Sequence, residues 1–123
     1  MARSRAEYLQ SRSDLLAELR SLTYHPLMRG SLVERLRRCG KPACACATDD
    51  DARHPGQFLT VSLDGATKAV HVRPEDEPFL REALGAYSRL WKILTDLTRL
   101  EIAEIKRAAG ERRRSRKKER SSR

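Results

Sequence analysis

Three cysteines and one histidine carry the clearest chemistry in this sequence. Cys39, Cys44 and Cys46 lie within eight positions of one another, and His54 follows shortly after them. An odd number of crowded thiols is a poor disulfide framework. Thiolate sulfur and imidazole nitrogen are instead the ligands that Zn2+ takes in tetrahedral structural sites. The spacing therefore predicts a metal site for one zinc ion, with Zn2+ as the only cofactor and Cys39, Cys44, Cys46 and His54 as ligands.

The loop around these residues suits a tight knuckle. Gly40 can adopt backbone angles that other residues avoid, and Pro42 stiffens the turn. The alternative is three ordinary buried thiols. Buried structural cysteines have no reason to gather among glycine, proline and aspartate, so metal binding is the favoured interpretation.

The fourth ligand has alternatives in the sequence. His71 lies in a predicted hairpin, where a solvated side chain is the default, and His25 follows the first predicted helix as a capping or surface residue. Asp49, Asp50 and Asp51 are expected to form a solvated loop, because cysteine-rich sites favour nitrogen and sulfur ligands. His54 is the preferred ligand.

Two segments must position the knuckle. Residues 6–24 form an amphipathic pattern with Tyr8, Leu15, Leu19 and Leu22 on one stripe, and Pro26 stops that helix. Residues 31–38 fit a strand or one helical turn, and we favour a strand because it must deliver Cys39. Residues 57–63 and 67–72 flank Asp64-Gly65, a hairpin signal. Its candidate core residues are these four: Phe58, Val61, Val70 and Val72.

A long helix is predicted over residues 75–107. Its apolar stripe comprises Phe79, Ala83, Tyr87, Leu90, Leu94 and Leu97. At ~1.5 Å per residue the helix would be roughly 50 Å long, more than two short strands can cover. The excess must pack on the first helix, on a second copy of the chain or on another protein. We predict a homodimer or coiled coil, with Leu90, Leu94 and Leu97 as its interface.

These elements predict an α+β fold, a small zinc-knuckle hairpin or three-stranded sheet flanked by an N-terminal helix and a long C-terminal helix. The predicted segments are 1–28 for the first helix, 29–74 for the knuckle and hairpin, 75–107 for the long helix and 108–123 for a disordered basic tail. Only six side chains are aromatic, so a thin core would depend on the metal for stability.

The formal charge of +9 is concentrated at the C-terminus. Residues 106–123 hold ten Lys and Arg against two Glu, and therefore carry +8 of it. Such an arm neutralises phosphates, so we predict mostly sequence-independent nucleic-acid binding. The predicted contacts are Arg112, Arg113, Arg114, Arg116, Lys117 and Lys118, with a second patch at Arg35, Arg37, Arg38 and Lys41. The alternatives are a solubilising tail or a partner for an anionic membrane.

Several function classes are not expected. No stretch approaches the ~18 apolar residues of a membrane span, and no secretory signal is recognisable, so a cytoplasmic location is predicted. Four ligands close the zinc shell, and no base stands beside it, so we expect no enzyme, no catalytic residue and no small-molecule substrate.

The string Cys39-Gly-Lys-Pro-Ala-Cys-Ala-Cys46, followed by His54, strands and a long helix, resembles a family of short bacterial zinc-binding domains of unknown function. The resemblance covers roughly residues 29–100. It implies a zinc site and, because such proteins are often encoded near transposases, a link to mobile elements. The sequence departs from the family at His54-Pro-Gly, where glycine and proline are exchanged and the aromatic run shrinks to Phe58.

Two functional hypotheses follow. The first is a zinc-stabilised nucleic-acid-binding accessory protein that uses the basic tail. The second is a zinc-braced helical module for protein interaction or dimerisation, without a nucleic-acid role.

Overall fold

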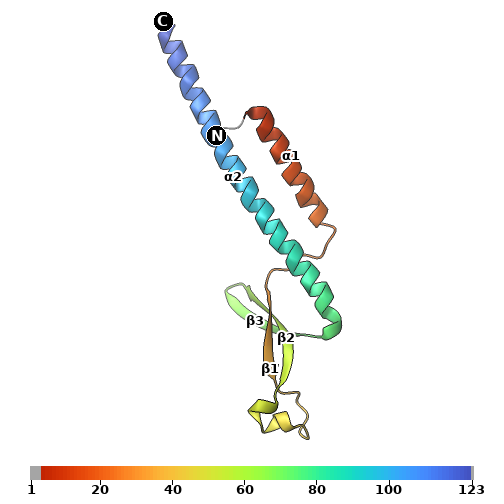
Figure 1. Cartoon of the computed structure of the whole chain (residues 1–123). Coiled ribbons are helices and arrows are strands. Elements are labelled where there is room, and N and C mark those ends of the chain that lie inside the picture. Colours follow the sequence, from red (N-terminus) through yellow and green to blue (C-terminus); the bar gives the residue numbers. More distant parts are fainter. Residues whose placement is uncertain (1–3, 123) are drawn as a thin grey trace. The chain divides into compact units, whose positions relative to one another are not determined.

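This computed structural model describes residues 4–122. The elements follow in the order α1 (Arg5–Leu22), β1 (Ser31–Arg37), η1 (Ala45–Ala47), η2 (Asp50–Ala52), β2 (His54–Leu63), β3 (Ala66–Val72), η3 (Pro74–Asp76) and α2 (Glu77–Ser121) (Figure 1). The predicted α+β fold, with a small sheet and two flanking helices, is confirmed. The chain forms two compact units, one from His25–Ser88 and one from the segments before His25 and after Ser88.

The first unit is built on an antiparallel sheet with the strand order β1-β2-β3. The predicted strand after Gly30 and the predicted hairpin are both confirmed, although β2 begins earlier than expected, at His54. Asp64 and Gly65 connect β2 to β3, with φ values of 52° and 81°. Two consecutive positive φ values match the twist of the strands that flank a two-residue hairpin turn.

The core of this unit lies between the sheet and the start of α2. Leu59, Val72 and Leu80 are buried together, and Met28, Leu32 and Leu84 pack against them. Among the predicted core residues, Val72 is buried and Phe58 and Val61 are half-buried. The prediction for Val70 was wrong, since this side chain is 51% exposed. Val70 lies on the edge strand β3, which has no neighbouring strand on its outer side within the described residues.

Gly30 allows the chain to enter β1 against the sheet. Its φ is +139°, and a Cβ atom there would lie 2.9 Å from Leu59 Cδ1 and 3.0 Å from the Thr60 carbonyl oxygen. Just before it, the Met28 N–H donates to the Ala83 carbonyl at 3.2 Å. These contacts tie the segment that leads to β1 both to β2 and to α2.

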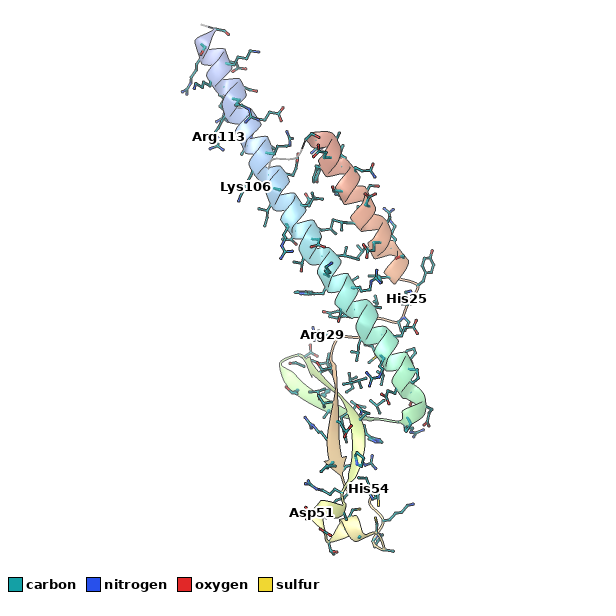
Figure 2. All side chains as sticks on the ribbon, in the orientation of Figure 1. His25, Arg29, Asp51, His54, Lys106 and Arg113 are labelled. Carbon is teal, nitrogen blue, oxygen red and sulfur yellow. The ribbon has the colours of Figure 1, made fainter. Side chains whose placement is uncertain are left out.

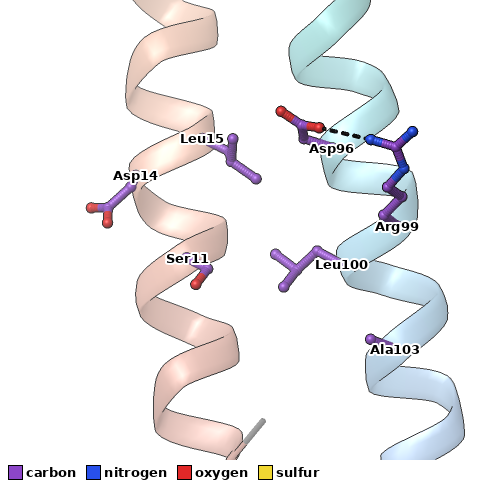
Figure 3. A pocket seen from close by; sticks show the side chains of 7 residues that line it. All are labelled: Ser11, Asp14, Leu15, Asp96, Arg99, Leu100 and Ala103. Carbon is purple, nitrogen blue, oxygen red and sulfur yellow. Dashed lines mark hydrogen bonds and ion pairs between the residues drawn. The ribbon is translucent and has the colours of Figure 1, made fainter. Parts of the chain in front are cut away.

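The second unit pairs α1 with the later part of α2. The Ser4 hydroxyl accepts from the Glu7 N–H at 3.2 Å and caps α1. Tyr8 and Leu22 of α1 are buried, as are Ile93 and Leu100 of α2. Leu15 and Leu100 point toward each other across the pair (Figure 3). Nearby, Arg99 donates to Asp96 of the same helix at 3.4 Å.

Polar residues that interrupt the apolar stripes are partners across this helix pair. The Tyr8 hydroxyl donates to the Glu101 carboxylate at 2.9 Å. Arg12, which falls on the stripe of α1, lies 3.5 Å from the same carboxylate. Arg5 donates to Glu104 at 3.0 Å. Arg5 and Arg12 of α1 therefore each lie beside a carboxylate of α2.

The C-terminal segment differs from the sequence prediction. A disordered tail was predicted over residues 108–123, whereas α2 continues to Ser121. The segment is rich in Ala, Arg, Lys and Glu, which are strong helix formers. Arg107 also donates to Glu111 at 2.6 Å, and this hydrogen bond bridges the helical turn that contains Gly110. The absence of apolar residues therefore did not prevent helix formation.

The apolar stretches of both helices are short. Among residues 4–122, no helix has a stretch long and apolar enough to cross a membrane.

Candidate metal centre

Cys39, Cys44, Cys46 and His54 meet in one cluster. One ligand atom from each residue lies within 4.8 Å of all the others, which is close enough to hold a metal ion. His54 lies at the end of the sheet where β2 begins (Figure 2). The fold thus brings together the four residues that their spacing singled out.

Strand pairing positions two of the four candidate ligands. Arg37, the last residue of β1, pairs with His54, the first residue of β2. Cys39 follows β1 by two positions, so it reaches the same end of the sheet. The antiparallel pairing of β1 with β2 therefore fixes the distance between the Cys39 and His54 backbones.

A compact loop positions the other two candidate ligands. Gly40 has a φ of +82°, which turns the chain away from β1. The Cys44 N–H then donates to the Lys41 carbonyl at 3.1 Å and closes the turn that contains Pro42. The short helix η1 carries Cys46 back toward Cys39. The glycine and proline that predicted a knuckle do form it.

The sulfur atoms lie close together. Cys39 Sγ is 3.5 Å from Cys46 Sγ. Cys44 Sγ is 3.3 Å from His54 Nε2. The Cys46 side chain is 0% exposed, whereas the other cysteines are only half-buried and His54 is exposed. Cys46 is thus the innermost member of the cluster.

The surroundings of the cluster lower the pKa of one thiol, that of Cys39. The pKa of Cys39 is lowered from 9.0 to about 6, chiefly because the Lys41 N–H donates to its sulfur and also because of the Cys46 side chain. For Cys46, a hydrogen bond from the Cys39 N–H lowers the pKa, but burial and the neighbouring thiols outweigh it, so its pKa is raised. A bound cation would favour the thiolate form of both groups.

Arg38 holds the loop in place, a role that the sequence pattern did not indicate. Its guanidinium donates both to the Cys46 carbonyl and to the Asp50 carboxylate. The Asp49 carboxylate accepts from the Asp51 N–H at 2.9 Å and caps η2. The acidic residues therefore shape the loop and lie outside the ligand cluster. A basic residue next to Cys39, in a loop that also carries Asp49, Asp50 and Asp51, is the signal that could have revealed this role.

The other two histidines lie elsewhere. His71 on β3 makes an edge-on contact with Phe58, with ring centroids 5.2 Å apart. His25 Nδ1 lies 3.0 Å from the Glu82 carboxylate, so it contacts α2 instead of capping α1. Neither belongs to the cluster that contains His54.

The predicted basic patch beside the knuckle is not uniform. Arg35 and Lys41 are exposed, whereas Arg37 is half-buried and its side chain lies against Gly56. Arg38 is engaged by the Cys46 carbonyl and the Asp50 carboxylate. Arg35 and Lys41 are therefore exposed members of this patch without an ion pair among residues 4–122.

The predicted contacts in the C-terminal segment are all exposed on α2. They comprise Arg112, Arg113, Arg114, Arg116, Lys117 and Lys118. None of the six forms an ion pair within residues 4–122. Figure 2 shows Arg113 on this part of the helix.

The predicted interface leucines are only partly exposed. Leu90 and Leu97 are half-buried, on the side of α2 that also buries Ile93 and Leu100, and Leu94 is 40% exposed. Their role in dimerisation stays a prediction.

A family assignment accompanies this geometry. A family described as a domain of unknown function (DUF6788) matches residues 5–82. The chain belongs to this family. The matched segment contains α1, the whole sheet and all four residues of the cluster, and it ends within the first turns of α2. No curated protein and no solved structure matches the chain.

Proposed function

We propose that this DUF6788 protein is a non-enzymatic, zinc-stabilised module that binds nucleic acid through the C-terminal part of α2. The metal half of the proposal is supported by the convergence of three thiols and one imidazole. The nucleic-acid half is supported by one observation, the six cations between Arg112 and Lys118 that no carboxylate of the described chain neutralises.

The donor set favours zinc over harder cations. Thiolate sulfur and imidazole nitrogen suit Zn2+, whereas Mg2+ and Ca2+ take oxygen ligands. Cys39, Cys44, Cys46 and His54 would hold the ion, and four protein ligands would leave no open position. Bound zinc would then supply a structural cross-link between the loop and the β1–β2 pair. In small domains such a link supplies about 10–16 kcal/mol of apparent folding free energy.

The helical conformation of the C-terminal basic segment suits binding in a groove of duplex nucleic acid. Successive residues of an α-helix are rotated by about 100°, so Arg112, Arg113 and Arg114 point to different sides. A helix with cations on all sides can contact the phosphates on both walls of a duplex groove. No aromatic residue is present after Trp91, so base stacking is not expected, and binding should be sequence-independent and sensitive to salt.

The resemblance of the knuckle supports a role as an accessory protein of mobile elements. Separately, the thiols of the cluster suit a reducing compartment such as the cytoplasm. A link of this kind would be tested by the identity of the neighbouring genes.

The metal half is tested by the metal content of the purified chain. We expect one zinc per chain by elemental analysis and loss of that zinc in Cys46→Ser and His54→Ala. The matched control is His71→Ala, which removes a histidine outside the cluster and should leave the content unchanged. A wild-type protein that takes up no stoichiometric zinc would overturn this half.

The nucleic-acid half is tested by a salt titration of binding to random duplex DNA. Replacing Arg112, Arg113 and Arg114 by glutamine should weaken binding and reduce the slope of log K against log salt by about 1 for each phosphate that is no longer neutralised. The control replaces Arg20, Lys68 and Arg73, three exposed cations without ion pairs in the described chain, and removes the same charge. Equal effects in both variants would contradict a binding role for the C-terminal segment.

A further inference from the structure

The sheet has an inner face, which packs against α2, and an outer face. Leu59 and Val72 point to the inner face, where they are buried with Leu80 of α2. Side chains alternate between the two faces of a strand, so Phe58 of β2 belongs to the outer face. The strand register places His71 of β3 directly opposite Phe58. The contact between the two rings shows that they share this face.

Apolar surface and positive charge lie side by side on the outer face. Val33 of β1 pairs with Phe58, so Val33, Phe58 and His71 form one row across the three strands. Arg35 and Arg37 follow Val33 at intervals of two residues along β1, and they therefore lie on the same face. Neither arginine forms an ion pair within the described part of the chain.

No carboxylate of the three strands shares the outer face with these arginines. Within the described strands, Glu34 is the sole acidic residue. It lies on the inner face, where its carboxylate accepts from Gln57 Nε2 at 3.5 Å. The strands therefore leave the positive charge of the outer face without a partner, and a ligand with phosphate groups would complement it.

Gly56 keeps one of the arginines close to the ring pair. A Cβ atom at this position would lie 3.1 Å from Arg37 Cδ and 3.5 Å from His71 Nε2. The aliphatic part of Arg37 therefore lies over Gly56, next to the imidazole. A larger residue in place of the glycine would separate the arginine from the rings.

The rings of Phe58 and His71 form a corner for one flat group. Their centroids lie 5.2 Å apart, and their planes meet at 63°. Because of this angle, one ring can stack on the face of a flat ligand while the other ring meets its edge. His71 is exposed, and its ring nitrogens can form a hydrogen bond with such an edge. A nucleobase offers both features, a π face and a hydrogen-bonding edge.

We propose that the outer face of the sheet binds an unpaired base of single-stranded DNA. Phe58 and His71 hold the base, and Arg35 and Arg37 neutralise the neighbouring phosphates. The inference rests on the proposed nucleic-acid binding for its class of ligand, and it adds a second site to the C-terminal segment. The strand must be unpaired, because the faces of a base inside a duplex are already stacked on its neighbours.

Val33 favours DNA over RNA at this site. The sugar lies between the base and its phosphates, and therefore near Val33, because both arginines are on the same strand as this residue. Valine offers only methyl groups there. The 2′-hydroxyl of a ribose would lose its hydration without gaining a hydrogen bond, whereas deoxyribose lacks this group.

Binding of three labelled single strands of equal length, measured by fluorescence anisotropy, tests the proposal. The strands are an oligothymidine, the same deoxyribose phosphate strand without bases, and an oligouridine. The abasic strand carries the same phosphates, so the ratio of its dissociation constant to that of the oligothymidine reports the base contacts alone. For the wild type we expect a ratio of about ten, the order of one stacked base. The oligothymidine should also bind more tightly than the oligouridine.

Substitutions of Phe58 assign this ratio to the ring. Phe58→Leu should bring the two affinities together, because leucine retains an apolar side chain but offers no π face. Phe58→Tyr should preserve the ratio. Val70→Ala is the matched control, since Val70 is 51% exposed but pairs with Leu59 on the inner face, and the ratio should be unchanged. Circular dichroism should show the same secondary structure in all of these variants.

The C-terminal cations distinguish this proposal from the proposed function. Replacing Arg112, Arg113 and Arg114 by glutamine should weaken the binding of duplex DNA but preserve the ratio between oligothymidine and abasic strand. Phe58→Leu should change the ratio and leave the affinity for duplex DNA unchanged. Equal affinities of the wild type for the two deoxyribose strands, or an unaltered ratio in Phe58→Leu, would overturn the site on the sheet. Tighter binding of the oligouridine would overturn the choice of DNA.

Discussion

The Tyr8 hydroxyl donates to both carboxylate oxygens of Glu101 at 2.9 Å, although 93 positions separate the two residues. This contact joins the first helix of the chain to a part of α2 beyond the segment matched by the family. The hydrogen bond to Glu101 is also the main reason that the pKa of Tyr8 is raised. Tyr8 itself is buried, so its hydroxyl depends on this partner.

Tyr8→Phe should therefore destabilise the helix pair. The change removes the donor and leaves the Glu101 carboxylate with fewer partners in a half-buried position. We expect Tm to fall by about 5 °C, the order expected when a small domain is deprived of one hydrogen bond. Thermal denaturation followed by circular dichroism measures the change. Tyr24→Phe is the control, because Tyr24 is 91% exposed, and an equal decrease there would assign the effect to something other than the Glu101 contact.

Acid should loosen the same helix pair through Glu104. The pKa of this carboxyl is lowered from 4.5 to about 2, chiefly by hydrogen bonds from Arg107 and also from Arg5. A group with a lower pKa in the folded chain binds protons more weakly there than in the unfolded chain. Its contribution to stability is therefore complete above pH 4.5 and is lost as pH falls toward 2.

The measurement is Tm as a function of pH for the wild type and Glu104→Gln. Glutamine cannot ionise, so the variant should have a lower Tm at neutral pH and a weaker dependence on pH between 4.5 and 2. Parallel curves for the two proteins in this window would contradict the role assigned to Glu104.

The cluster of three cysteines and one histidine and the hairpin were predictable because their signals are local. Cys39 to His54 spans a single loop, and Asp64-Gly65 marks its own turn, so spacing and residue type were sufficient. The contacts of Glu101 and Glu104 were not predictable in the same way. Within one helix, these residues only interrupt an apolar stripe, and their partners lie on a helix that is distant in the sequence.

Two predictions were wrong because they relied on residue type alone, the disorder of the C-terminal segment and the surface role of Arg38. The C-terminal segment lacks apolar residues, which indicated disorder, but local helix propensity was the stronger influence. Arg38 was grouped with surface cations because charge alone does not reveal a partner. Its hydrogen bonds to Cys46 and Asp50 depend on the path of the loop, which the sequence pattern does not give.

Gly30 should tolerate a side chain less well than Gly65, although both have positive φ values. A Cβ at Gly30 would meet the Leu59 side chain and the Thr60 carbonyl, whereas a Cβ at Gly65 would meet nothing within 4 Å. We expect Gly65→Ala to cost about 1 kcal/mol from backbone strain alone. Gly30→Ala should cost about 3 kcal/mol, since overpacking adds to that strain. Urea denaturation measures both, and equal costs would show that the contact at Gly30 is unimportant.

Removal of the metal should unfold the two units unequally. The sheet unit has few buried side chains, and the proposed zinc links its loop to β1 and β2. The helix pair has its own contacts, including Arg5 with Glu104, and these do not involve the cluster. After chelation, hydrogen exchange should accelerate across β1 and β2 while amides of α1 stay protected. Equal acceleration in both units would show that they unfold together.

A substitution of Arg38 distinguishes a role in metal binding from a role in nucleic-acid binding. Its guanidinium bridges the Cys46 carbonyl and the Asp50 carboxylate, and lysine cannot reproduce a planar fork that reaches both. Groups that orient metal ligands typically alter metal affinity by about 10–100-fold when they are replaced. Arg38→Lys should therefore weaken zinc binding in a competition assay with a chromogenic chelator, although the charge is unchanged.

Arg35→Lys is the matched control, because Arg35 is exposed and forms no ion pair within residues 4–122, so the zinc affinity of this variant should equal that of the wild type. Binding of duplex DNA should be similar in both variants, since each keeps its positive charge and the C-terminal cations are untouched. A decrease of DNA affinity in Arg38→Lys with normal zinc affinity would return Arg38 to the nucleic-acid surface. A decrease of zinc affinity alone would assign it to the support of the metal loop.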